Sequence, residues 1–136
     1  MAVKRFTVGS VEDEARLILL DTYDDAYRFE PKEVYQAMKD GLLRLRRERP
    51  ASRYVGGILV DLEFVDGSTS VTDVPAVLDD ATRAEFRARE VTMEERWKEA
   101  VVYYVAHRMY QKDDPDTKND ALSTRYFEMY TAAKGG

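Results

Sequence analysis

The segment 97–110 most constrains how this chain folds, because its pattern predicts a helix that is apolar on nearly every side. At 100° per residue, Trp97, Val101 and Tyr104 share one face, and Val102 lies on the far side. A narrow polar strip is formed by three basic side chains, Lys98, Arg108 and Lys112. Such a helix needs neighbours around most of its circumference.

Two compatible interpretations follow for this helix. It is the central core helix of the domain, or part of its tyrosine side packs against another copy of the chain. Tyrosine suits an interface because its ring adds contact area and its hydroxyl tolerates a wet rim. We therefore expect self-association. The candidate interface residues are Leu43, Trp97, Tyr103, Tyr104, His107, Tyr110, Tyr126, Phe127 and Tyr130.

Two helices are predicted in the first half of the chain. Ser10 has the form of a helix cap, which predicts a helix over 10–21. A second helix begins at Pro31, a favoured first position, and ends near Arg49. Leu43 lies almost opposite the apolar face of this second helix. An exposed leucine of that kind is usually without significance, but it can also mark a partner surface.

The period changes to two over residues 58–65, which predicts a strand, and Asp66-Gly67 favours a tight turn into a second strand over 68–74. Residues 75–90 are ambiguous, with a short helix around 81–88. Thr92 opens a capping box that predicts a helix running to residue 112. A last helix is expected from Pro115, with Asp114 as its cap.

Together these patterns predict a mainly α fold of four helices with a β-hairpin, at about 54–75, inserted between helices two and three. The 136 residues suit a single domain, 1–136, and show no internal repeat. No apolar run is long enough to span a membrane, and no secretion signal is visible. We expect a soluble protein of the cytoplasm in which it is made.

The residues that carry most catalytic chemistry are scarce. Cysteine is absent and His107 is the only histidine, which excludes thiolate metal sites and cysteine nucleophiles. Four aspartates lie within eight residues but lack the spacing of a calcium loop: Asp113, Asp114, Asp116 and Asp120. No glycine-rich phosphate-binding motif is present. We therefore expect no enzymatic activity, no metal and no cofactor.

Charge is unevenly distributed along the chain. Residues 54–82 contain six acidic side chains and no lysine or arginine, and four of the six fall in the predicted hairpin: Asp61, Glu63, Asp66 and Asp73. The end of the second helix is basic instead, with Arg44, Arg46, Arg47 and Arg49. These arginines are most simply a solvated helix end, but they are also candidates for contact with an acidic partner or with nucleic acid.

The segment 99–113, EAVVYYVAHRMYQKD, resembles the third helix of the head–tail adaptor (connector) proteins of tailed bacteriophages. That family often has alanine, aliphatic, tyrosine and arginine residues at this spacing, then an acidic turn with asparagine and a helix with tyrosine and phenylalanine. Asn119, Ala121, Tyr126 and Phe127 fit the later part. The first half of the chain agrees with the family in the order of three features: Asp21, the segment 27–29 and Arg49-Pro50. The family often has tryptophan in place of Phe29.

The resemblance covers about 10–50 and 97–130 and leaves the hairpin and residues 75–92 as an insertion. It implies a small helical virion protein, made in the host cytoplasm. About a dozen copies would form a ring that binds the portal protein and then tail or stopper proteins, and DNA would pass through the ring without specific binding. Because acidic walls repel phosphate, Asp61, Glu63, Asp66 and Asp73 are the candidate lining of this channel.

Two other functions stay open. The arginines of the second helix suit a small nucleic-acid-binding packaging or regulatory protein, although a formal net charge of −5 argues against one. The aspartates suit a small metal-dependent enzyme. Salt-dependent retention on DNA and calorimetric titration with divalent cations discriminate between these functions.

Overall fold

The fold is mainly helical. The computed structural model describes residues 4–21, 29–60, 74–112 and 117–135, with the side chains of 117–120 excepted. Five α-helices lie within this part of the chain, together with two small antiparallel sheets of two strands each. The fifth helix is the short one at 80–88, which the four-helix arrangement expected from the sequence leaves out of its count.

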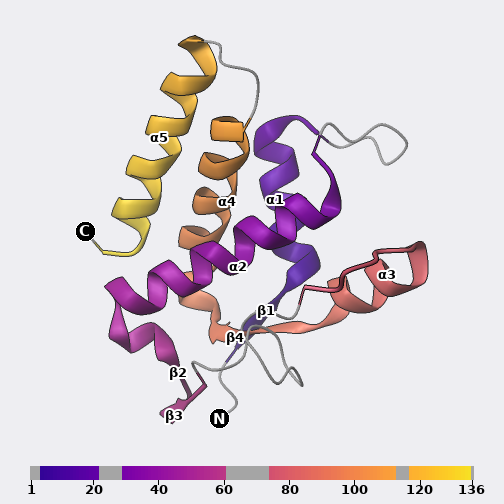
Figure 1. The fold of residues 1–136 in the computed structure, drawn as a ribbon. Helices are drawn as coiled ribbons and strands as arrows, with labels where there is room; N and C mark the ends of the chain where they lie inside the picture. The colour runs from indigo at the N-terminus through magenta and orange to yellow at the C-terminus, as the bar shows by residue number, and fades with distance from the viewer. Residues whose placement is uncertain (1–3, 22–28, 61–73, 113–116, 136) are drawn as a thin grey trace.

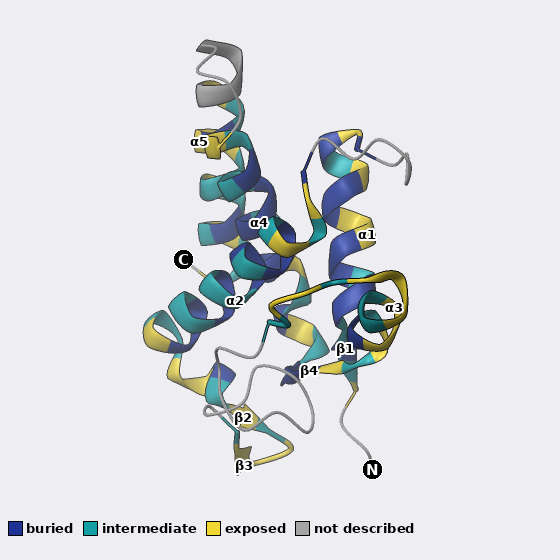
Figure 2. Cartoon of the chain, turned by 45° about the vertical axis from the view of Figure 1, so that its right-hand side comes forward, coloured by how far each residue is buried: buried dark blue, intermediate teal, exposed yellow. Residues whose placement is uncertain are grey.

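Helix α4 (Lys98–Lys112) is the centre of the molecule. Helix α5 (Thr117–Ala133) lies along one flank of α4, α1 (Val8–Leu19) lies along the other, and α2 (Pro31–Glu48) crosses this layer (Figure 1). Figure 2 shows that α4 is buried along most of its length. The core interpretation of the segment 97–110 is therefore correct, since three helices of the same chain cover it.

The close approach of α2 to α4 depends on Gly41. A Cβ atom at this position would lie 2.6 Å from Cδ1 of Tyr104 and 3.0 Å from its Cγ, closer than side chains normally pack. Glycine therefore allows the Tyr104 ring to lie against the α2 backbone. The start of α2 agrees with the prediction, because Pro31 is its first residue and the flanking Phe29 and Val34 are both buried.

The start of α1 differs from the prediction. Thr7, not Ser10, is the cap: its Oγ1 accepts a hydrogen bond from the Ser10 backbone N–H at 3.2 Å, so the helix begins at Val8. The helix ends at Leu19, and Leu20 follows in the left-handed region with φ of 56°. Arg16 and Leu17 carbonyls accept the Leu20 N–H, which closes the last turn.

A two-stranded sheet precedes α4 where a helix start was expected. Strand β4 (Glu90–Glu94) pairs antiparallel with β1 (Arg5–Thr7), and a 3₁₀ turn (Glu95–Trp97) then leads into α4. The capping-box prediction at Thr92 is therefore wrong. Residues 91–93 are all buried, and pairing with a strand some 85 positions away outweighs the local capping signal.

A second small sheet follows α2 and a 3₁₀ turn (Pro50–Arg53). Strand β2 (Tyr54–Val55) pairs with β3 (Ile58–Leu59) around Gly56 and Gly57, both of which have positive φ. This hairpin lies between the second and third helices, but it is earlier and shorter than the one predicted. Of the strands predicted over 58–65 and 68–74, residues 61–65 and 68–73 lie outside the described residues, as does the turn between them.

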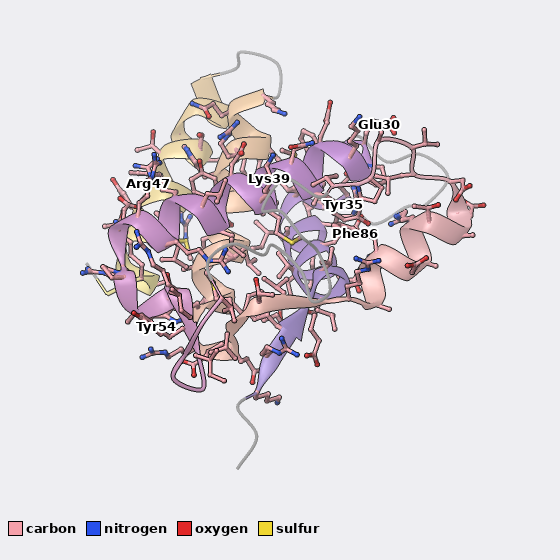
Figure 3. The ribbon with its side chains drawn as sticks, turned by 60° about the horizontal axis from the view of Figure 1, so that its bottom comes forward. Glu30, Tyr35, Lys39, Arg47, Tyr54 and Phe86 are labelled. Atoms are coloured by element: carbon pink, nitrogen blue, oxygen red, sulfur yellow. The ribbon has the colours of Figure 1, made fainter. Side chains whose placement is uncertain are left out.

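Helix α3 (Asp80–Ala88) is placed where a short helix was considered. Asp79 caps it, accepting the Thr82 backbone N–H at 2.8 Å. Phe86 turns inward to meet the Tyr35 ring, with centroids 5.1 Å apart, and Figure 3 shows the two side chains between α2 and α3. In the described part of the chain, no helix has both the length and the hydropathy that a membrane crossing requires.

Candidate interaction surfaces

The predicted aromatic interface residues come together, but they meet one another between α4 and α5. Tyr110 stacks on Tyr126 with centroids 5.7 Å apart, and Tyr104 meets Tyr130 edge-on at 5.3 Å. His107 lies 5.0 Å from the Phe127 ring. These contacts form what we call the aromatic seam: Tyr103, Tyr104, His107, Tyr110, Tyr126, Phe127 and Tyr130.

Burial separates the seam into two groups. Tyr104 and Tyr130, like Trp97, are covered by the chain itself and present almost no surface to a partner. Five other side chains keep a partly exposed edge: Tyr103, His107, Tyr110, Tyr126 and Phe127. The tyrosine side of α4 is therefore satisfied largely within one copy of the chain.

His107 joins α4 to α5 through Ser123. Its Nδ1–H donates to the Ser123 carbonyl at 2.9 Å, and the Ser123 hydroxyl donates to the His107 carbonyl at 3.1 Å. Burial lowers the pKa of His107, and the nearby positive charges of Arg108 and Arg44 lower it further. This histidine is therefore a neutral packing residue at neutral pH.

The four arginines proposed for partner contact have different environments. Arg46 is buried and donates to the Thr92 carbonyl at 2.9 Å and to the Val60 carbonyl at 3.0 Å. Arg49 donates to the Lys134 and Gly135 carbonyls. These two guanidinium groups hold the fold together.

Arg44 and Arg47 remain at the surface. The Arg44 guanidinium lies 4.7 Å from the Phe127 ring centre and pairs with Glu48 at 3.2 Å. Arg47 is exposed at the outer edge of α2 (Figure 3). Of the four arginines, these two are therefore the ones that a partner can reach.

A groove between α2 and α4 combines this basic charge with Leu43. We call it the basic groove; it has a volume of about 460 Å³ and is lined by Asp40, Leu43, Arg44, Arg47, Tyr104 and Arg108. Three guanidinium groups face one carboxylate here, and that carboxylate, Asp40, pairs with Arg108 at 3.5 Å. Leu43 is half-buried at this groove.

A second groove, between α1 and α4, has the opposite charge. We call it the acidic groove; its lining residues are Glu14, Leu17, Ile18, Glu95, Lys98, Glu99, Val102 and Tyr103. Three carboxylates and one ammonium group surround an apolar floor. Lys98 pairs with Glu14 at 3.2 Å, and the Tyr103 hydroxyl donates to Glu99 at 2.8 Å.

Two leucines at the end of α1 are exposed and were not singled out from the sequence. Leu17 is 66% exposed and Leu20 is 87% exposed. The signal was available for Leu17, because it lies off the apolar stripe of its helix as Leu43 does. Leu20 carried no signal, because its exposure depends on where α1 ends.

The polar interior is a structural cluster around Glu12. Its carboxylate is fully buried and accepts hydrogen bonds from four side chains: Arg16, Tyr35, Arg83 and Arg87. Arg16 also donates to Asp21 at 2.7 Å and to the Phe29 carbonyl. The cluster thus links α1, α2 and α3 and positions the chain on either side of residues 22–28.

The four acids proposed to line a channel, Asp61, Glu63, Asp66 and Asp73, lie outside the described residues. Within the described residues, no three acidic or histidine side chains are grouped as metal ligands would be. No known protein family, curated protein or solved structure matches this chain.

Proposed function

We propose that this chain is a structural protein of the head–tail adaptor (connector) kind, forming a ring between the portal and the tail of a tailed bacteriophage. The observation that carries the proposal is the adaptor-like pattern of residues 99–113, continued by Tyr126 and Phe127. These residues fall on α4 and α5, the paired helices at the centre of a mainly helical fold.

The distribution of surface groups supports a ring. A closed ring of identical chains repeats one heterologous interface, so each copy needs two different complementary surfaces. Glu99, at the acidic groove, and Arg108, at the basic groove, are nine positions apart on α4. At 100° per residue they point in opposite directions, so the two grooves lie on opposite sides of this helix.

The proposed partners lie above and below the ring: the portal protein on one side and tail or stopper proteins on the other. The β2–β3 hairpin suits contact with a neighbouring ring, because it carries three exposed apolar side chains, Tyr54, Ile58 and Leu59. We propose about twelve copies, located in the virion after assembly in the host cytoplasm. The acidic channel lining, 61–73, stays a prediction.

The alternative of a nucleic-acid-binding protein loses part of its basis. It rests on four arginines at the end of α2, of which Arg46 is buried and Arg49 binds backbone carbonyls at the C-terminus. Two surface arginines on a chain with a net charge of −5 are a weak electrostatic footprint for DNA.

The proposal is tested by the assembly state of the purified chain. Light scattering and electron microscopy, with and without an added portal protein, are expected to show closed rings of about twelve copies. A chain that forms no ring under either condition contradicts the proposal. Retention on duplex DNA that weakens steeply with salt would favour the alternative instead.

A further inference from the structure

We infer that the exposed leucines of α1 dock into the basic groove of a second copy of the chain. Leu17 and Leu20 together are called the leucine ridge, and the ridge and Glu14 form one partner surface. The basic groove, with Leu43 at its apolar part and Arg44, Arg47 and Arg108 around it, forms the other. This inference rests on the proposed ring and names the residues of its repeating interface.

Leu20 exposes apolar area in a strained backbone conformation. Leu20 has φ of 56°, a conformation in which glycine is normally found at a helix end, and its side chain is 87% exposed. The hydrogen bonds that end α1 offset part of this strain, but the Leu20 side chain contributes almost no burial within the described part of one copy. A leucine in that conformation is explained if the side chain is buried against a partner.

The leucine ridge and Glu14 lie near one another in sequence at the end of α1. Glu14 and Leu17 are three residues apart on α1 and line the same groove, and Leu20 follows directly after the last residue of the helix. Glu14 has a half-exposed side chain whose one ion-pair partner in the described structure is Lys98. The ridge therefore combines two exposed leucines with a carboxylate on its flank.

The charges of the two surfaces are complementary. The lining of the acidic groove, to which Glu14 and Leu17 belong, carries three carboxylates and one ammonium group, a net charge of −2. The lining of the basic groove carries three guanidinium groups and one carboxylate, a net charge of +2. Opposite charges of this kind favour contact between the acidic groove of one copy and the basic groove of another. They disfavour contact between two acidic grooves or between two basic grooves.

The positions of the two surfaces set the direction of the contact between copies. The two surfaces lie on opposite sides of α4 and are different from each other, so their contact joins copies head to tail and not about a two-fold axis. A repeated head-to-tail contact leaves neither surface uncovered once the ring closes. The occupant of the basic groove is therefore the leucine ridge of the next copy.

The absence of cysteine from the chain makes cross-linking a direct test. The double variant Leu20→Cys/Leu43→Cys, treated with a short bis-maleimide cross-linker, is expected to give a ladder of covalent multimers. Each single variant leaves one thiol per copy and is expected to give no ladder. Leu20→Cys/Leu59→Cys is the matched control, because Leu59 is an exposed leucine on β3, away from the basic groove. A control ladder as strong as the test ladder, or no test ladder, overturns the inference.

Leu20→Gly separates a docking role from a folding role. Glycine relieves the backbone strain, so the thermal midpoint of the variant is expected to rise by about 3 °C. Its self-association, measured by sedimentation, is expected to weaken about tenfold because the ridge has lost a leucine. Unchanged association would overturn the inference, and the higher midpoint would show that the variant still folds.

Charge reversal tests the other surface. Arg47→Glu is expected to weaken association about tenfold, whereas Lys112→Glu, an equal change at an exposed position outside both grooves, is expected to have little effect. Equal effects of the two reversals would contradict the inference.

The outcomes also separate this inference from the proposed function. If the Leu20→Gly and Arg47→Glu variants still form closed rings as readily as the wild type, the inference is overturned and the adaptor proposal still holds. If the Leu20→Cys/Leu43→Cys variant gives a ladder of cross-linked multimers but the assemblies are open filaments that never close, the inference is supported and the proposed ring is contradicted.

Discussion

Glu12 shows what single residues contribute to this fold. Burial opposes its ionisation, but hydrogen bonds from Tyr35 and Arg16 and the Arg16 charge outweigh burial and lower the pKa of Glu12. Its contribution to stability is therefore present above a pH of about 4.5 and is lost as the pH falls through the lowered pKa. The ion pairs and hydrogen bonds of Glu12 are thus a condition for packing α1 against α2 and α3.

Removal of this carboxylate gives the first prediction. Glu12→Ala leaves Arg16 buried beside a cavity, and we expect the free energy of unfolding to fall by about 3–5 kcal/mol. Asp13→Ala is the control, because the Asp13 side chain is 66% exposed and pairs with Arg87 at the surface; its expected cost is about 1 kcal/mol or less. Urea denaturation at pH 7 measures both, and equal losses would contradict this account.

The second prediction concerns His107. Because its pKa is lowered in the folded chain, the unfolded chain takes up a proton first, and stability declines as the pH falls below about 6.5. We expect the thermal unfolding midpoint to decrease as the pH is lowered from 7.5 to 5.5. The variant His107→Gln is expected to show a smaller decrease. NMR titration of the only histidine gives its pKa directly. A value above 6.5 would refute the assignment.

At the scale of elements, Arg46 ties α2 to β4. Arg46→Ala leaves the Thr92 carbonyl without its charged donor in a buried place, and we expect a loss of about 2–3 kcal/mol. Arg47→Ala, one position along on the exposed side of α2, is expected to change the free energy of unfolding by about 0.5 kcal/mol or less. Chemical denaturation of the pair measures the difference. Equal effects would mean that Arg46 is not buried as described.

The helices and strands were predictable from the sequence to different extents. Helical periodicity located α2 and α4 well, because their apolar positions repeat every 3.6 residues and Pro31 marks a start. It missed β1, which is three residues long and forms only because β4 pairs with it. The capping box at Thr92 failed for the same reason, since a local signal says nothing about a distant partner.

The candidate surfaces were predictable in part. Leu43 was identified from its place opposite the apolar face of its helix, and it lines the basic groove. The tyrosines of α4 were correctly grouped, but the pattern did not distinguish another copy from α5 as the element that covers them. Likewise, the four arginines between residues 44 and 49 formed one basic series in the sequence. The burial of Arg46 and the hydrogen bonds of Arg49 to backbone carbonyls assign these two to structural roles.

At the scale of the whole molecule, the large exposed apolar side chains of the described residues lie elsewhere than on α4. The chain covers α4 itself, and among the described residues the exposed large apolar side chains are at the end of α1, on the β2–β3 hairpin and before α3: Leu17, Leu20, Tyr54, Ile58, Leu59 and Val77. Figure 1 places the end of α1 and the hairpin at opposite ends of the molecule. Separate patches of this kind suit an assembly in which each copy contacts both its ring neighbours and another ring.

The acidic segment gives the last prediction, which concerns the assembled ring. If Asp61, Glu63, Asp66 and Asp73 face the channel, their replacement by Asn or Gln removes the repulsion of phosphate. We expect rings of this variant to retain short duplex DNA at low salt, whereas wild-type rings let it pass.

A control with the same net charge distinguishes a local lining from overall charge. Four exposed acids outside the segment, Glu30, Glu85, Glu90 and Glu128, are replaced by Gln. Rings of this control are expected to behave like wild type, because the charge they lose is not in the channel. Equal DNA retention by both variants in a filter-binding assay would assign the effect to net charge, and the acidic segment would then have no special place in the ring.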